Sequence, residues 1–106
     1  MTVYSGERIG SLVYVYVDGR PLCPRLDLRP HSPTGFNWGY CGSGPAQLAL
    51  AILAYHWATD ENRALRCYQA FKERVIAPIQ NDRWTLTQAQ VAEVLERIEA
   101  PDRAIA

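Results

Sequence analysis

The fold is decided by residues 35–57, GFNWGYCGSGPAQLALAILAYHW, in which a glycine-rich loop leads into an apolar helix. Between residues 45 and 54 the only polar side chain is that of Gln47. A helix that is apolar nearly all round must be covered on several sides. We therefore predict that this helix is the central element of the core, with Pro45 at its first position, where the missing N–H of proline costs nothing.

Length and composition indicate one ordinary globular domain. The chain has 106 residues, of which 48% are hydrophobic and 21% are charged, as is typical of folded proteins. Eleven basic residues balance eleven acidic ones, so no global field attracts nucleic acid or an anionic membrane. The longest apolar run, residues 48–54, is far shorter than the roughly 18 residues of a membrane span. The chain start lacks the pattern of a secretion signal. We expect a single cytoplasmic domain over residues 1–106, without nucleic-acid or membrane partners, and the oligomeric state stays open.

The cysteines argue against a disulfide framework. Cys23, Cys41 and Cys67 are odd in number and widely spaced, and no C-x-x-C pair is present, so neither disulfides nor a structural zinc site is expected. His31 and Asp27 add no recognisable ligand spacing. We predict reduced thiols, no metal and no cofactor.

Three antiparallel strands are predicted before the central helix. They are rich in β-branched and aromatic residues and cover residues 4–9, 12–17 and 20–23. Gly10-Ser11 suits a type II′ hairpin turn between the first two, and Asp18-Gly19 suits a type I′ turn before the third. Pro21 cannot donate to a ladder, which places the third strand at an edge and makes it short.

Two further helices are predicted after the central one, which we expect to end near Ala58. Thr59 or Asp60 is the candidate N-cap of the second helix. Its apolar residues recur on one face, and Pro78 ends it.

The third helix has a T-x-x-Q capping box formed by Thr87 and Gln90, followed by a clear amphipathic stripe. Pro101 stops this helix and leaves residues 100–106 as a frayed tail. The predicted fold is therefore α+β, with a three-stranded antiparallel meander packed by three helices. A short fourth strand around Trp84 is an open alternative.

Three motifs support a family resemblance. They are SPTGFNWGY at residues 32–40, GSGPAQLALA at residues 42–51 and WTLT at residues 84–87. With these motifs the chain resembles a family of small, functionally uncharacterised proteins found in bacteria and their phages or plasmids. The resemblance covers most of the chain, implies a shared fold and brings no assigned chemistry.

The loop Gly42-Ser43-Gly44 is a candidate binding site for an anion or a nucleotide. Backbone N–H groups point outward at a helix start, and the helix dipole adds about half a positive charge there. Arg25 or Arg29 is the candidate partner that would complete an anion site. The P-loop lysine is absent. Alternatively, the glycines only permit a sharp entry and close packing of the loop, with Ser43 or Gly44 as the N-cap.

Catalysis has weak support in the sequence. Cys41 lies just before a helix start, and His31 or His56 is the candidate base. No orienting Asn or Asp can be paired with either histidine. Ser43 lacks the flanking glycines of a G-x-S-x-G elbow. We therefore assign no catalytic residue and expect no enzyme.

Aromatic residues alternate in the loop before the helix, at Phe36, Trp38 and Tyr40. Either they plug the core or they form an exposed patch of the kind enriched in protein interfaces. We predict a small non-enzymatic protein-interaction domain with a protein partner. The resemblance adds a role as an accessory or anti-defence factor of a phage or mobile element. The alternative is a small-molecule or nucleotide-binding domain that uses the helix start at residues 42–44.

Overall fold

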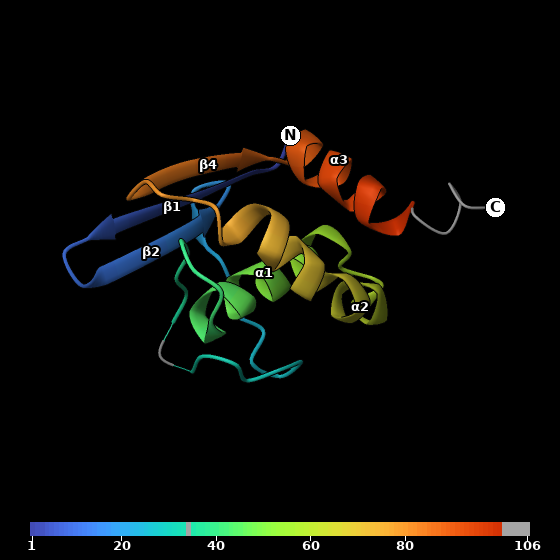
Figure 1. The fold of residues 1–106 in the computed structure, drawn as a ribbon, viewed down its shortest axis with the longest axis horizontal. Helices are drawn as coiled ribbons and strands as arrows, with labels where there is room; N and C mark the ends of the chain where they lie inside the picture. The colour runs from blue at the N-terminus through green and yellow to red at the C-terminus, as the bar shows by residue number, and fades with distance from the viewer. Residues whose placement is uncertain (34, 101–106) are drawn as a thin grey trace.

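Four antiparallel strands form one sheet in the order β3-β2-β1-β4 (Figure 1). The computed structural model describes residues 1–33 and 35–100. The strands are β1 (Val3–Ile9), β2 (Leu12–Val17), β3 (Arg20–Pro21) and β4 (Arg83–Thr87). The predicted meander is confirmed, and the short fourth strand around Trp84 is present. The frayed tail predicted for residues 100–106 lies, except for Ala100, outside the described residues.

Both predicted hairpin turns are confirmed by the backbone. Gly10 has a φ of 59° and Ser11 has no positive φ, as a type II′ turn requires. Asp18 and Gly19 have φ values of 51° and 80°, the pattern of a type I′ turn. The third strand is shorter than predicted, since it comprises only Arg20–Pro21. Just beyond it, Leu22 still donates its backbone N–H to the Val15 carbonyl of β2 at 3.0 Å and buries its side chain in the core.

Three helices follow the meander. They are α1 (Ser43–His56), α2 (Glu61–Phe71) and α3 (Gln88–Glu99), and a π-helical turn, η1 (Lys72–Ile76), extends α2. Asp60, not Thr59, caps α2 by accepting a hydrogen bond from the Arg63 N–H at 3.1 Å. The capping box of α3 is confirmed, since Thr87 and Gln90 exchange bonds of 2.9 and 3.2 Å. None of the helices in the described ranges is long and apolar enough to cross a membrane.

The start of α1 lies earlier than predicted, since the helix begins at Ser43 and not at Pro45. Gly42 is the N-cap, with an extended backbone and no side-chain hydrogen bond. Ser43 and Gly44 are therefore already helical, and neither of them caps the helix. Because glycine has no side-chain oxygen, the first turn of α1 is left without the usual side-chain acceptor.

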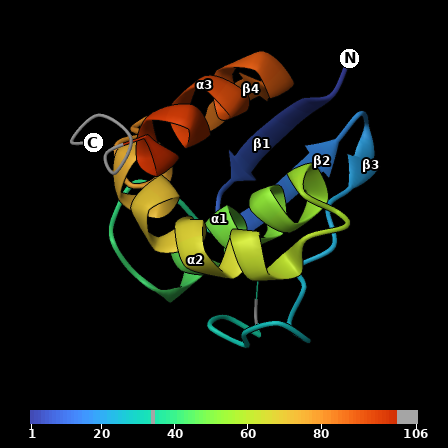
Figure 2. The same ribbon diagram turned by 90° about the vertical axis from the view of Figure 1, so that its right-hand side faces the viewer.

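Helix α1 is the central core element, as the sequence predicts. All of its residues from Gly44 to Ala54 are buried, and Figure 2 shows α1 lying between the sheet and α2. Tyr4, Val15 and Val17 bury their side chains on the sheet face that α1 covers. The opposite face of the sheet carries exposed apolar residues, at positions 9, 12 and 14.

Gln47 is fully buried on α1 and has all its hydrogen-bonding groups engaged. Its Oε1 accepts the backbone N–H groups of His31 and Ser32 at 2.8 and 3.1 Å. Its Nε2 donates to the Pro24 carbonyl at 2.5 Å. A buried amide is stable only when it is paired in this way. The only polar residue in the buried part of α1, residues 44–54, thus anchors the connection between β3 and the glycine loop.

Gly6 and Trp84 form a cross-strand pair on the inner face of the sheet. A Cβ added to Gly6 would lie 2.3 Å from the indole of Trp84. That indole packs edge-to-face against Trp38, with ring centroids 5.6 Å apart. The indole of Trp84 therefore occupies the space that a side chain at position 6 would fill.

We predict that Gly6→Ala lowers the free energy of unfolding by about 1–3 kcal/mol, the usual cost of overpacking a core. Denaturant unfolding would measure it. Ser5→Ala is the control, because a substitution on the solvent side of the same strand changes stability by less than about 0.5 kcal/mol. If Gly6→Ala were as stable as the parent protein, the contact with Trp84 would not limit the packing.

Candidate functional site

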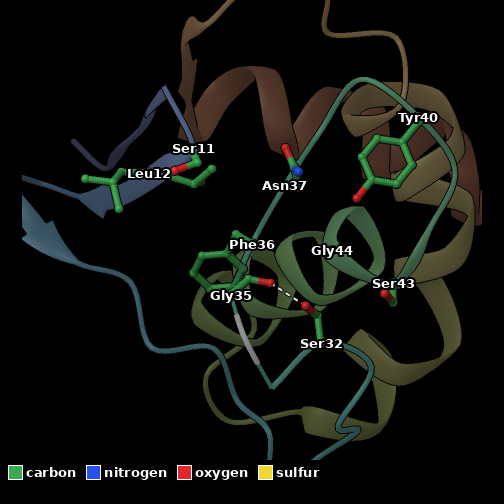
Figure 3. Close-up of a pocket in the computed structure, with 10 residues that line it drawn as sticks. Ser11, Leu12, Ser32, Gly35, Phe36, Asn37, Tyr40, Ser43 and Gly44 are labelled. Carbon is green, nitrogen blue, oxygen red and sulfur yellow. Dashed lines mark hydrogen bonds between the residues drawn. The ribbon is translucent and has the colours of Figure 1, made fainter. Parts of the chain in front are cut away.

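A pocket of about 430 Å³ opens at the start of α1 (Figure 3). Three segments line it: the tip of the β1–β2 hairpin, the loop before α1, and the first turn of α1. The lining residues are Ser11, Leu12, Val13, Ser32, Gly35, Phe36, Asn37, Tyr40, Ser43 and Gly44. The volume lies within the range of small-molecule sites. The polar groups among these residues are hydroxyls and amides, and none of the residues is charged.

The backbone at the start of α1 offers unused donors to this pocket. Ala46 is the first residue whose N–H bonds back, to the Gly42 carbonyl at 3.0 Å. Within residues 1–33 and 35–100, the N–H groups of Ser43 and Gly44 have no hydrogen-bond partner. Pro45 has no N–H. Unpaired N–H groups at a helix start carry the positive end of the helix dipole.

Arg8 on β1 fixes the orientation of the Asn37 amide in the pocket wall. Arg8 Nη2 donates to Asn37 Oδ1 at 2.6 Å and to the Trp38 carbonyl at 3.1 Å. The Trp38 N–H also donates to Asn37 Oδ1, at 2.9 Å. Because both groups that contact this oxygen are donors, the amide cannot be reversed, and its Nδ2 faces the other way. Figure 3 shows the Asn37 nitrogen on the side of α1.

Tyr40 packs over the glycine loop and points its hydroxyl toward the start of α1 (Figure 3). A Cβ on Gly42 would lie 2.4 Å from the Tyr40 ring. A Cβ on Gly44 would lie 2.8 Å from Asn37 Cβ and 3.3 Å from the Tyr40 hydroxyl. Gly44 is helical without a positive φ, so it is needed for space and not for an unusual backbone conformation. The glycines let the loop lie directly against the helix start.

The structure separates the three aromatic residues predicted as an interaction surface. Phe36 is half-buried in the pocket wall, and Tyr40 is 49% exposed at the rim. Trp38 is only 1% exposed, so it does not belong to a surface patch. Its indole fills the core between Trp84 and Arg8, whose guanidinium carbon lies 4.6 Å from the ring centroid.

Neither arginine proposed for an anion site lies at the pocket. Arg25 pairs with Asp27 at 3.0 Å and also with Glu61, and these hydrogen bonds raise the pKa of its guanidinium. It lines a separate hollow beside the C-terminal half of α1. Arg29 is exposed, and its Nη1 donates to the Leu28 carbonyl at 2.9 Å. Of its two ionic partners, Asp27 is only two residues away, whereas Glu61 lies 36 positions further along the chain and could not be predicted.

The thiols and imidazoles do not assemble into a catalytic group in the described part of the chain. Cys23 and Cys41 are exposed and Cys67 is buried, which raises the pKa of the Cys67 thiol. His31 Nε2 lies 2.6 Å from the Tyr68 hydroxyl, and His56 is at the far end of α1 from Cys41. No group of three or more His, Cys, Asp or Glu side chains in residues 1–33 and 35–100 could hold a metal ion.

Two residues that shape the pocket were missed by reasoning from the sequence. Arg8 reads as an ordinary polar residue of a strand, and Asn37 reads as a spacer in the aromatic loop. The only feature of the sequence that could have pointed to Asn37 is its position inside the long motif of residues 32–40. The contact between the two is tertiary, since 29 positions separate them.

The family comparison covers residues 4–97, which include every residue of the pocket. The chain belongs to the family of unknown function DUF6166. Neither the comparison with curated proteins nor the comparison with solved structures found a match. Membership of DUF6166 confirms that the chain belongs to a family without an assigned function, and it assigns no chemistry to the pocket.

We predict that Arg8→Lys lowers the free energy of unfolding by about 1.5–3 kcal/mol, the scale of hydrogen bonds to charged groups. Lysine keeps the charge but cannot bond to Asp82, Asn37 and Trp38 at once or stack on an indole as arginine does. Arg97→Lys is the matched control, because its ion pair with Glu93 is mostly exposed and is worth less than about 1 kcal/mol. Equal losses in the two variants, measured by denaturant unfolding, would contradict the role given to Arg8.

We predict that the free energy of unfolding depends on pH through the protonation of His56. Burial, and then the charge of Arg63, lower the pKa of His56 in the folded protein. The unfolded chain therefore binds a proton more readily, and the free energy of unfolding falls as the pH drops through about 6.5 and below. His56→Gln should reduce this fall when unfolding is measured between pH 7.5 and pH 5.5. The same pH slope in both proteins would show that His56 does not contribute.

Proposed function

We propose that this domain is a non-enzymatic binding module whose pocket at the start of α1 holds an anionic group of a small ligand, a carboxylate or a phosphate. The observation that supports it is the convergence of hydrogen-bond donors on one hollow. They are the N–H groups of Ser43 and Gly44, the Nδ2 of Asn37 and the hydroxyl of Tyr40.

The donors are fixed before any ligand arrives. The two backbone N–H groups are held by α1, and Arg8 holds the Asn37 amide through its oxygen. Donors that need no reorganisation lower the cost of binding. Since none of the described lining residues carries a carboxylate, an anion would meet no like charge from them. The positive end of the α1 dipole favours the same type of ligand.

Arg8 lies behind the Asn37 amide and donates to its oxygen at 2.6 Å. Its charge polarises the amide and makes the Nδ2 a better donor. With no lysine or arginine in the lining, binding depends on hydrogen-bond geometry more than on net charge. We therefore expect selectivity for the shape of the oxyanion and only a moderate dependence on salt.

A protein partner is the second candidate. Leu12 is 57% exposed and Tyr40 is 49% exposed, and both line the same pocket. Exposed aromatic and apolar residues beside polar donors are typical of protein interfaces, and a partner could present a carboxylate to the donors. A role in a phage or mobile element stays a proposal that rests on the resemblance alone.

We predict that inorganic phosphate, titrated into ¹⁵N-labelled protein at pH 7, shifts the amide resonances of Ser43 and Gly44. Asn37→Asp should weaken this response by about tenfold or more, which corresponds to about 1.4 kcal/mol. The substitution keeps the oxygen that Arg8 and Trp38 contact and replaces the Nδ2 donor by a negatively charged acceptor.

Asn62→Asp is the matched control, because it makes the same change of charge at an exposed position on α2. Its affinity for phosphate should equal that of the parent protein. If phosphate shifted no resonance in the first turn of α1, or if Asn37→Asp bound it as well as the parent does, the anion site would be refuted. A carboxylate such as acetate, titrated in parallel, would show which oxyanion the pocket prefers.

A further inference from the structure

The two edges of the sheet differ in how they are protected against pairing. The β3 edge consists of two residues, one of which is Pro21, and Pro24 follows closely. Short strands and prolines are ordinary means of blocking an edge. The β4 edge has five residues, Arg83–Thr87, and contains no proline. In Figure 1, β4 lies along the rim of the molecule with no described element beyond it.

The register shows which backbone groups of β4 are unpaired. Hydrogen bonds from Arg8 N–H to the Asp82 carbonyl, at 2.8 Å, and from Gln88 N–H to the Thr2 carbonyl, at 2.9 Å, flank the β1–β4 ladder. Because bonding alternates along an antiparallel strand, positions 84 and 86 face β1, and Arg83 and Thr85 face outward. No hydrogen bond of these two backbones to another described residue is present.

Apolar side chains lie beside this edge. A groove of about 520 Å³ runs between β4 and the segment before it, and its apolar lining includes Val75, Ile79, Trp84 and Leu86. Trp84 and Leu86 are only partly buried. A strand added to β4 would therefore gain backbone hydrogen bonds and also cover apolar surface.

We propose that β4 pairs with β4 of a second copy of this chain, antiparallel and centred on Thr85, so that the two sheets become one continuous sheet. In this register the two Thr85 residues lie opposite each other and exchange backbone hydrogen bonds. Arg83 lies opposite Thr87 of the second copy, and its N–H faces that residue's carbonyl, whereas the Thr87 N–H already donates to Gln90 Oε1 in the capping box of α3. Trp84 lies opposite Leu86 of the second copy on the inner face.

The sequence of β4 is complementary to itself in this register. The only charged residue of the strand, Arg83, faces a threonine, and its guanidinium is already paired with Glu7 at 2.8 Å. Centring the pair on Arg83 would instead place like charges opposite each other, which is unfavourable. Centring on Thr85 also places all five residues of the strand opposite a residue of the second copy, the most that any two-fold register allows, and only the Thr87 N–H stays with the capping box of α3. The net charge of zero leaves no global repulsion between two copies.

The side chain of Thr85 provides the test, because it lies on the outer face of the sheet at the two-fold axis. Sedimentation velocity on the full chain, from about 1 μM to about 1 mM, covers weak association. The parent protein should show a monomer–dimer equilibrium. Thr85→Lys or Thr85→Glu alone places like charges opposite each other and should raise the dissociation constant by about tenfold or more.

An equimolar mixture of the two variants should form a heterodimer. Ser5→Lys, on the same face but one strand inside the edge, should dimerise like the parent protein.

A monomeric parent protein at about 1 mM, well above the dissociation constants of most specific contacts, would overturn the proposal. So would dimers of Thr85→Lys and Thr85→Glu as stable as the parent dimer, or a mixture of the two variants that stays monomeric. Circular dichroism establishes that each variant is folded. An independent readout is the exchange of the Arg83 and Thr85 amide protons in the parent protein, which should slow as its concentration rises. Exchange that does not change with concentration would contradict the pairing.

Discussion

The guanidinium of Arg8 connects three segments on which the pocket depends. It extends from the centre of the sheet to Asn37 and Trp38 in the loop before α1, and to Asp82 before β4, at 3.0 Å. It also lies over the indole of Trp38. The Arg8 side chain is 27% exposed, and its hydrogen bonds to Asn37 and Trp38 are partly buried, which strengthens them. The Asp82 side chain is 73% exposed, so that ion pair lies at the surface. One side chain thus determines both where the loop lies and which way the Asn37 amide faces.

Close packing at α1 is the second constraint. A helix buried on all sides requires its connections to cross it at short distance, and glycine is the only residue that leaves room for this at positions 42 and 44. The same closeness brings Asn37 and Tyr40 to the first turn of the helix. The alternatives of structural glycines and a binding loop are therefore not exclusive. The packing that requires glycine also assembles the donors that face the pocket.

Local features were predictable from the sequence because their causes lie within a few residues. The two hairpin turns, the capping box of α3, the Asp60 cap and the burial of α1 each follow from short motifs or periodicity. The N-cap of α1 was predicted one or two residues too late. The pattern of apolar residues that predicts the helix does not show that the Tyr40 ring packs on Gly42.

The site itself depended on tertiary contacts that the sequence does not show. The burial of Trp38 follows from its contacts with Arg8 and Trp84. Arg8 lies far before Trp38 in the sequence, and Trp84 lies far after it. The positions of Arg25 and Arg29 are set by the way Gln47 holds the connection after β3. Residue type alone suggested two separate sites, one aromatic and one glycine-rich. In the structure, Phe36 and Tyr40 of the aromatic set and Ser43 and Gly44 of the glycine loop line the same pocket.

The pocket and the β4 edge share one structural element, the Trp38–Trp84 contact, and yet they are physically separate. Trp84 extends from β4 toward the inner face and packs on Trp38, which adjoins the loop of the pocket. The outward-facing backbone groups of Thr85 lie in the plane of the sheet, and its side chain lies on the outer face, away from that contact. Pairing along the edge therefore adds hydrogen bonds without moving the inner aromatic layer. Because packed cores resist displacement, we expect that the proposed ligand in the pocket and the proposed second copy at β4 would not exclude each other.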